Sequence, residues 1–237
     1  MSQREESKKA AGYSAVDDLV KPGMKLGLGT GSTALFAVRR AAQGFQKGLY
    51  PGLLVVPTSL ETLWECQALG LQVCDLNDPQ IGAALDLYID GADEFDPHLN
   101  AIKGGGAAHT LEKLVCSASS RFVIIADETK KVPHLGTRFP VPVEVLSQAR
   151  VLVTRRLEAF GAQVKLRTGS GKQGPVITDN GHILLDLVFE QPIKNVKALE
   201  DSINQISGVI DCGLFPSMAS LAYVGCNDGK VEILQPL

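Results

Sequence analysis

The sequence is poor in aromatic residues, cysteine pairs and long apolar runs, and each shortage excludes a class of protein. Phe, Trp and Tyr make up only 5% of the 237 residues. The five cysteines are scattered and form no C-x-x-C pair, so neither a disulfide framework nor a structural zinc site is expected. No apolar run approaches the roughly 18 residues of a membrane span, and the polar start lacks the apolar core of a secretory signal. We therefore expect a cytoplasmic protein that does not bind a membrane.

The chain also lacks an excess of charge of either sign. With 23 Lys and Arg against 26 Asp and Glu, the net charge is −3. Proteins that bind nucleic acid normally carry a basic face, so nucleic acid is not an expected partner. A hydrophobic content of 45% with 21% charged residues is typical of a globular protein, and the length suits one large domain with a smaller companion.

Glycine is abundant, with 24 residues, and short apolar runs alternate with helical patterns from about residue 10 to 130. The apolar runs predict strands, and the stretches between them predict helices. This alternation favours a parallel sheet covered by helices on both faces, with right-handed crossovers. The expected strands are 24–29, 53–57, 71–74, 85–90 and 122–127, and the expected helices are 32–43, 60–69 and 110–118.

The pattern changes near residue 132, where two prolines lie in a strand-like segment. The order strand, helix, strand, hairpin and helix then predicts a ferredoxin-like domain, with the hairpin turn at Asn180-Gly181. Its expected elements are a strand around 140–145, a helix at 146–160, strands at 164–167, 176–179 and 183–189, and a helix at 196–206. The predicted fold class is α/β: a Rossmann-like, mostly parallel sheet with helices on both faces over residues 1–131, rejoined by about 207–237, and a smaller ferredoxin-like α+β domain over 132–206.

Three short segments directly follow predicted strands or join a strand to the next helix, at the edge where open parallel sheets bind ligands. The first, GLGTGST, spans residues 27–33. It is neither a dinucleotide fingerprint, because Ser32 takes the third glycine position, nor a P-loop, because no Gly-Lys-Ser/Thr follows. A glycine-rich junction with hydroxyls at a helix N-terminus instead suits one phosphate. An ordinary turn in which Ser or Thr caps the helix is the alternative.

The second segment, DGADEFD, places four carboxylates within residues 90–96. Carboxylates this close repel one another, and their burial needs compensating partners. A solvated acidic loop and a metal site are the alternatives, but the spacing matches neither an EF-hand loop nor a His-containing transition-metal site. Asp90 directly ends an apolar strand, which makes it the strongest functional candidate of the four.

The third segment, KGGGAA, runs from Lys103 to Ala108 and precedes a helix with Glu112 in its first turn. Successive glycines let a backbone fold around a ligand with its N–H groups turned inward, whereas a flexible linker is the alternative. A lysine near the acidic segment would neutralise carboxylates and hold a substrate oxygen. Glu112 near Lys103 would form a pair of base and electrostatic stabiliser for proton transfer.

In this order and at these separations, GLGTGST, DGADE and KGGGAA followed by Glu112 closely resemble type A ribose-5-phosphate isomerases. The resemblance covers essentially the whole chain, with KKAA at 8–11, IADETK at 125–130, FPVPVEV at 139–145 and TDNG at 178–181. It implies an aldose–ketose isomerase of the non-oxidative pentose phosphate pathway, which interconverts ribose 5-phosphate and ribulose 5-phosphate through an enediolate. It further implies a phosphosugar substrate, no metal or organic cofactor, and a homodimer or homotetramer.

The resemblance also implies roles for individual residues. Glu112 matches the general base, and Lys103 matches the residue that stabilises charge on O1 and O2. Asp90 matches a carboxylate that handles hydroxyl protons and assists ring opening, and Asp93 matches a neighbour that orients the substrate. The implied substrate-binding residues are Thr30, Gly31, Ser32, Thr33, Asp90, Gly91, Ala92, Asp93, Lys103, Gly104, Gly105, Gly106 and Lys130, with Lys8 as a further contributor.

Two features depart from the family pattern. His109 stands where an apolar residue is usual, and we interpret it as a supporting residue rather than a catalytic one. The loop 168–174 is rich in Gly and Lys, and we expect it to be mobile.

Two other classes of function are the alternatives. One is a sugar-phosphate sensor without catalysis, although too few residues precede the first strand for a DNA-reading module. The other is a different enzyme of similar fold, such as a coenzyme A transferase with a glutamate nucleophile or an amino-sugar phosphate deaminase.

Overall fold

The computed structural model describes residues 2–171 and 173–237, and the chain forms two compact units. Unit 1 comprises the chain up to Ala92 together with Leu111–Lys130 and Met218–Leu237. Unit 2 comprises Asp93–Thr110 and Lys131–Ser217. Residues 93–110, which the sequence analysis assigns to the first domain, therefore make their contacts within unit 2. That the chain divides after residue 131 into two independently folding domains stays a prediction.

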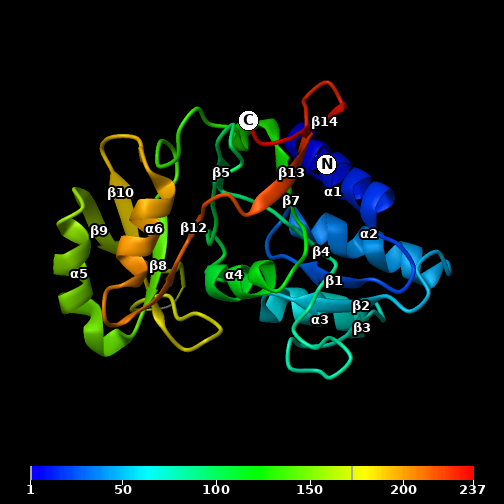
Figure 1. The fold of residues 1–237 in the computed structure, drawn as a ribbon, viewed down its shortest axis with the longest axis horizontal. Coiled ribbons are helices and arrows are strands. Elements are labelled where there is room, and N and C mark those ends of the chain that lie inside the picture. Colours follow the sequence, from blue (N-terminus) through cyan, green and yellow to red (C-terminus); the bar gives the residue numbers. More distant parts are fainter. Residues whose placement is uncertain (1, 172) are drawn as a thin grey trace. The chain divides into compact units, whose positions relative to one another are not determined.

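Unit 1 is built on a seven-stranded sheet in the order β14-β13-β7-β4-β1-β2-β3. Neighbouring strands are parallel except β13 and β14, which are antiparallel. The expected mostly parallel sheet is confirmed, and the C-terminal strands rejoin it beside β7 (Figure 1). The strands are β1 (Lys25–Leu28), β2 (Leu54–Pro57), β3 (Gln72–Val73), β4 (Leu87–Asp90), β7 (Phe122–Asp127), β13 (Ala219–Gly225) and β14 (Val231–Leu234).

Side chains alternate between the two faces along each strand, so both faces of this sheet offer side chains for packing. Helices cover both faces. Leu26 and Leu28 of β1 belong to a core that includes buried residues of α1 (Gln3–Leu19), α2 (Ala34–Gln46) and α3 (Leu60–Ala68). Gly27 faces the opposite side, where a Cβ on it would lie 2.6 Å from Val115 of α4 (His109–Ser117). Glycine at this position lets α4 pack closely on the sheet.

Helix α1 is an element that the sequence pattern does not predict. Its buried positions are mostly small residues, among them Ala11, Gly12 and Ala15, so no wide apolar stripe marks the segment. The helix begins with a capping box, in which Ser2 accepts from the N–H of Glu5 and the Glu5 side chain accepts from the N–H of Ser2. The small residues let α1 approach α2 and strands β7 and β13.

Strands β1 and β4 are neighbours within the sheet, and the chain leaves them toward opposite edges. From β1 it continues to β2 and β3, whereas from β4 it continues by way of unit 2 segments to β7. Such a reversal is a topological switch point, where parallel sheets leave a crevice for a ligand beyond the carboxyl ends of the strands. The first two candidate segments, 27–33 and 90–96, begin at these two strand ends.

Unit 2 contains a four-stranded antiparallel sheet in the order β11-β8-β10-β9. This strand order, with one helix after β8 and one after β10, is the ferredoxin-like arrangement expected from the sequence. Its elements are β8 (Val141–Val145), α5 (Arg150–Glu158), β9 (Ala162–Leu166), β10 (Ile183–Phe189), α6 (Val196–Asn204) and β11 (Val209–Cys212). A three-stranded sheet joins β5 (Glu94–Phe95), β6 (Ala101–Ile102) and β12 (Leu214–Phe215).

A hairpin is expected around Asn180-Gly181, and the prediction of its first strand is wrong. Residues 176–179 form no strand, and Ile177 makes only a single bridge to Ile183. The reason is that a strand has two edges, and both edges of β10 are already paired, with β8 and β9. The loop 168–174 includes Lys172, which lies outside the described residues.

Candidate active site

Asp90 ends β4 at the switch point and is fully buried. Its Oδ1 accepts hydrogen bonds from the backbone N–H of Thr30 at 3.1 Å and of Gly91 at 2.6 Å, and its Oδ2 accepts from the hydroxyl of Tyr88. These donors compensate the loss of water around a buried carboxylate. Gly29 makes room for the carboxylate, since a Cβ on Gly29 would lie 1.8 Å from Cγ of Asp90.

If Asp90 has the catalytic role that the family resemblance implies, Gly29→Ala is expected to lower the turnover of ribose 5-phosphate at least about 100-fold, because the new methyl group and the Asp90 carboxylate cannot occupy the same space. Turnover and the thermal unfolding midpoint measure the effect on activity and on the fold. Gly169→Ala is the matched control, because its Cβ would have its nearest neighbour at 3.5 Å. Unchanged turnover in Gly29→Ala would contradict a catalytic role for Asp90 in this position.

Tyr88 is hydrogen-bonded to Asp90 and also lies within the electrostatic influence of Glu112. Burial raises the pKa of Tyr88 well above its usual value, and the nearby charges of Asp90 and Glu112 raise it further. Tyr88 is therefore protonated at neutral pH and donates to Asp90. Glu112 lies in the first turn of α4 and is only 3% exposed. The predicted base and the predicted carboxylate of unit 1 therefore both act on the same buried phenol. Tyr88 was missed, although its position two residues before Asp90 places both on one face of the strand.

The loop from Thr30 to Thr33 joins β1 to α2. Thr33 is the N-cap residue, but its side chain makes no capping hydrogen bond within the described chain, so the structure does not support the simple capping alternative. The hydroxyl of Thr30 is hydrogen-bonded to that of Thr58 at 2.8 Å, and Thr62 donates to the carbonyl of Gly29 at 2.8 Å. Thr58 and Thr62 were not predicted from the sequence, because the junction after β2 carries no glycine motif.

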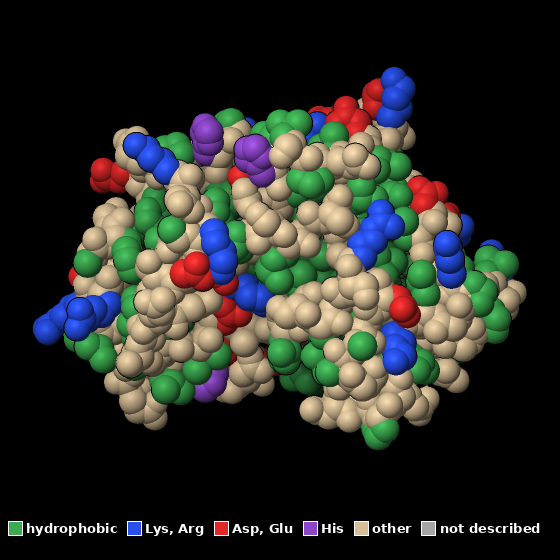
Figure 2. Space-filling view, viewed as in Figure 1, with side chains coloured by type: hydrophobic (Ala, Val, Ile, Leu, Met, Phe, Trp, Pro, Cys, Tyr) green, Lys and Arg blue, Asp and Glu red, His purple; other side chains and the backbone are tan. Residues whose placement is uncertain are grey.

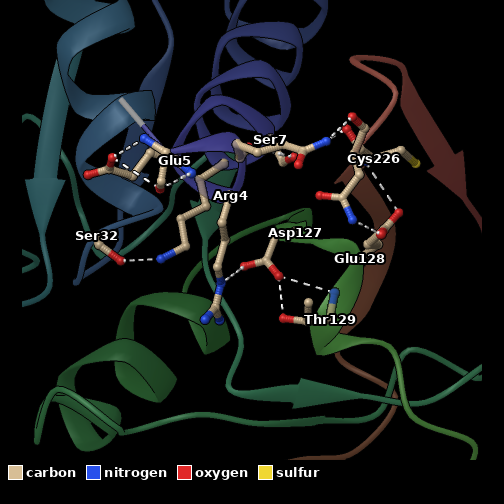
Figure 3. A network of polar contacts seen from close by, with 12 residues as sticks. Arg4, Glu5, Ser7, Ser32, Asp127, Glu128, Thr129 and Cys226 are labelled. Carbon is tan, nitrogen blue, oxygen red and sulfur yellow. Dashed lines mark hydrogen bonds and ion pairs between the residues drawn. The ribbon is translucent and has the colours of Figure 1, made fainter.

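Basic side chains lie beside this loop. Lys8 of α1 donates from Nζ to Oγ of Ser32 at 2.8 Å (Figure 3). Burial lowers the pKa of Lys8, and the neighbouring charges of Arg4 and Lys130 lower it further. Lys130 ends the short 3-10 helix η1 (Glu128–Lys130) that follows β7. Unit 1 therefore gathers the predicted residues Ser32, Lys8 and Lys130 at one edge of the sheet.

Unit 2 contains Lys103 and the glycine loop. Lys103 is 2% exposed, and its Nζ lies 5.4 Å from the ring centroid of Phe215. The backbone N–H of Lys103 donates to the carbonyl of Gly213 at 2.9 Å, and the N–H of Gly105 donates to Oδ2 of Asp93 at 2.7 Å. Because hydrogen bonds hold the loop at both Lys103 and Gly105, it is not a flexible linker. Unit 2 brings together Asp93, Lys103 and Gly104–Gly106.

Arg167 donates hydrogen bonds to this glycine loop, and this contact was not predicted from the sequence. Its Nη1 donates to the carbonyls of Gly104 at 2.7 Å and Gly105 at 3.3 Å, while its Nε donates to Oδ2 of Asp186 at 2.9 Å. Gly104 has a φ of +100°, and a Cβ there would lie 2.7 Å from Nδ1 of His109. No signal in the sequence indicates a contact between residues 63 positions apart.

Two of the four clustered carboxylates stabilise the fold. Glu94 is buried and accepts hydrogen bonds from backbone N–H groups within residues 136–139. Asp96 accepts from the N–H groups of residues 98 and 100. Burial of Asp90, Glu94 and Asp96 contradicts the solvated acidic loop. In the described part of the chain, no group of three His, Cys, Asp or Glu side chains is arranged to hold a metal.

The start of α4 is anchored by the remaining motifs of the resemblance. Glu144 of FPVPVEV is fully buried and accepts from the hydroxyls of Thr110 and, at 2.6 Å, Thr178, and from the side chain of Asn180 at 3.2 Å. His109 is also fully buried, and its Nε2 lies 3.2 Å from the carbonyl oxygen of Asp211. These contacts agree with a supporting role for His109 and fix the first turn of the helix that carries Glu112.

Figure 2 shows Lys and Arg side chains interspersed with acidic and apolar ones over the visible face, without one continuous basic surface. Among the described residues, no helix combines the length and the apolar character that a membrane crossing requires.

An open parallel sheet with buried carboxylates and a hydroxyl-rich loop at its switch point defines an α/β protein that binds a small ligand at the carboxyl edge. Comparison with known proteins identifies the family. The model of ribose 5-phosphate isomerase A (phosphoriboisomerase A) matches residues 54–229. The chain is 45% identical over 233 residues to ribose-5-phosphate isomerase A of Treponema denticola, covering 96% of this chain and 98% of that protein. It belongs to the ribose 5-phosphate isomerase A family.

Other relatives agree over the full length. The human ribose-5-phosphate isomerase is 42% identical over 238 residues, which cover 98% of this chain and 74% of that protein. A D-ribose-5-phosphate isomerase solved in complex with phospho-erythronic acid has a TM-score of 0.94 and 36% identity, and the match covers 99% of this chain and 100% of that chain. The isomerase of Plasmodium falciparum has a TM-score of 0.91 and 35% identity, covering 96% and 97% of the two chains. The likeness therefore includes both the parallel sheet and the antiparallel unit.

Proposed function

We propose that this chain interconverts D-ribose 5-phosphate and D-ribulose 5-phosphate through an enediolate, as an aldose–ketose isomerase of the pentose phosphate pathway. The family relationship over almost the whole chain supports this function. The structural observation that carries it is the buried group of Asp90, Tyr88 and Glu112 in unit 1. Two buried carboxylates that both act on Tyr88 suit a reaction that moves two kinds of proton.

The proposed reaction divides the proton transfers between these two carboxylates. Glu112 removes the proton from C2 of the open-chain aldose and returns it to C1, so the carbon skeleton gains and loses one proton. Asp90 handles the hydroxyl proton that moves between O2 and O1, and assists ring opening beforehand. Lys103 supplies the positive charge that stabilises the enediolate oxygens.

The remaining predicted residues bind the substrate. The loop Thr30–Thr33, with Lys8 and Lys130, binds the phosphate, because hydroxyls, a helix N-terminus and ammonium groups all favour a dianion. Binding energy from this remote group positions the reacting carbons. The residues that orient the sugar hydroxyls are Gly91, Ala92, Asp93, Gly104, Gly105 and Gly106.

The choice among the alternative functions rests on the family relationship, and so do the proposals on cofactor, location and assembly. The comparisons offer no support for a sugar-phosphate sensor, and the matched relatives bear names of isomerases rather than transferases or deaminases. We further propose that the protein works without a metal or organic cofactor, as a cytoplasmic homodimer or homotetramer.

Activity in the presence of a chelator tests the reaction class and the absence of a metal together. Purified protein treated with EDTA is expected to convert ribose 5-phosphate to ribulose 5-phosphate at an unchanged rate, measured by proton NMR of both sugars. Activity that is lost on chelation and restored by a divalent cation would overturn the metal-free mechanism. If no ribulose 5-phosphate forms while glucosamine 6-phosphate releases ammonia, the isomerase assignment is wrong.

A further inference from the structure

Arg4 lies near Lys8, which contacts the proposed phosphate loop of unit 1. Neither the motifs nor the family resemblance assigns Arg4 a role. It precedes Lys8 by four residues on α1, so the two side chains project from the same side of the helix one turn apart. Lys8 in turn contacts Ser32 of the proposed phosphate loop at 2.8 Å. The helix therefore presents two cations, Lys8 toward Ser32 and Arg4 toward Asp127, and Figure 3 labels Arg4 and both acceptors.

Asp127 at the end of β7 holds Arg4 in this place. The Asp127 side chain is 2% exposed and accepts from Nε of Arg4 at 3.1 Å, from the N–H of Thr129 at 3.1 Å and from the Thr129 hydroxyl. Burial raises the pKa of Asp127, but the hydrogen bonds from Thr129 and Arg4 outweigh it and hold this pKa below its usual value. One ionised carboxylate thus ties α1 to the turn that carries Lys130.

This contact leaves most of the Arg4 guanidinium available. Asp127 takes only the Nε–H, and the terminal nitrogens of Arg4 point away from it in Figure 3. The Arg4 side chain is 53% exposed, and Asp127 is its one hydrogen-bonding partner among the residues that the structure describes. A planar guanidinium held at one nitrogen presents its remaining donors as a fork, which matches the geometry of a phosphate.

Three cations act on one another at this edge. Arg4, Lys8 and Lys130 carry three positive charges, and the acidic groups that act on Lys8 are Asp127 and Glu5. Glu5 is engaged in the capping box at the start of α1. Arg4 and Lys130 repel the charge of Lys8, and a dianionic phosphate beside Ser32 would relieve this repulsion, which favours binding.

We propose that Arg4 binds the 5-phosphate of the substrate together with Lys8, and that Asp127 positions Arg4 for this contact. The inference rests on the proposed function, because it assigns a further phosphate-binding residue to the same site. It predicts that Arg4 contributes to the affinity for phosphorylated sugars and not to the chemical step.

The variant Arg4→Gln tests the proposal through the kinetic parameters. KM for ribose 5-phosphate is expected to rise about tenfold, the scale of one charge-assisted hydrogen bond at a half-exposed site, while kcat changes less than about twofold. Arg4→Lys keeps the charge but not the fork and should give an intermediate KM. An unchanged KM in Arg4→Gln, or a fall in kcat with no change in KM, would overturn the proposal.

Arg39→Gln is the matched control, because Arg39 also makes one ion pair, from Nε to Glu65 at 2.7 Å, and its side chain is 47% exposed. It should leave KM unchanged, and both variants should keep the thermal unfolding midpoint of the unmodified protein. An equal rise of KM in the two variants would mean that a general loss of positive charge explains the effect, and the proposal would be wrong.

Binding of inorganic phosphate, measured by calorimetric titration, separates this inference from the proposed function. The dissociation constant is expected to rise about tenfold in Arg4→Gln and to stay unchanged in Arg39→Gln. If phosphate binding depends on Arg4 while ribose 5-phosphate is not isomerised, the Arg4 contact stands and the proposed function fails. If isomerisation is normal while phosphate binding does not depend on Arg4, only this inference fails.

Discussion

Replacing Glu112 with glutamine is expected to lower kcat at least about 100-fold without unfolding the protein. Glutamine has the size and shape of glutamate, which suits a side chain that is only 3% exposed, but it cannot accept a proton from carbon at neutral pH. The same variant should also slow the exchange of the C2 hydrogen of ribose 5-phosphate with solvent deuterium. Turnover measurements and proton NMR of the substrate in heavy water test both effects.

Glu61→Gln is the matched control for this experiment. Glu61 also lies in the first turn of a helix, α3, but its side chain is exposed. This control should keep the kcat of the unmodified protein. The assignment of Glu112 as the base would be contradicted by unmodified turnover in Glu112→Gln, or by slower turnover with exchange at C2 still at full rate.

Replacing Lys103 with methionine is expected to lower kcat by about 100-fold to 1,000-fold, because the enediolate loses the positive charge that stabilises its oxygens. Methionine keeps an unbranched stem against Phe215, whose ring centroid lies 5.4 Å from Nζ of Lys103. Kinetic assays of the variant give the size of the loss, and thermal unfolding shows whether the fold is kept.

Lys165→Met supplies the comparison for Lys103→Met. Lys165 lies on β9 of the same unit and is exposed, so its replacement should leave kcat unchanged. Turnover within about twofold of the unmodified protein in Lys103→Met would remove Lys103 from the proposed mechanism.

Much of the main sheet could be predicted because its strands are short apolar runs buried on both faces. Asp90 was identifiable for the same reason, since a carboxylate that ends an apolar run lies at the carboxyl edge of the sheet. Glu112 was identifiable from its place in the first turn after a glycine-rich segment. Helix α1 was not identifiable, because its buried face is made of small residues such as Ala11 and Ala15 rather than of an apolar stripe.

The partners of the site residues were largely beyond the reach of sequence patterns. Arg167 on the glycine loop, Glu144 on Thr110 and Asp127 on Arg4 are contacts between segments far apart in the chain. Each is a polar group that is satisfied only when its own element packs against another, and local periodicity carries no information on that packing. The first arm of the predicted hairpin is not a strand for a related reason: the turn forms, but β10 pairs with β8 and β9, and Ile177 makes only one bridge to Ile183.

By itself, the sequence determined the alternating α/β order, the ferredoxin-like order of the second part, and the residue types that the chemistry needs at strand ends and helix starts. These features are local, since they follow from periods of two and 3.6 residues and from glycine at tight turns. Only the tertiary structure decided that residues 93–110 belong with unit 2, that each carboxylate of DGADEFD has its own hydrogen-bond donors, and that the charges of Asp90 and Glu112 both act on Tyr88. The physical reason is that a buried polar group is stable only beside a partner, and the partner is chosen by how distant elements pack.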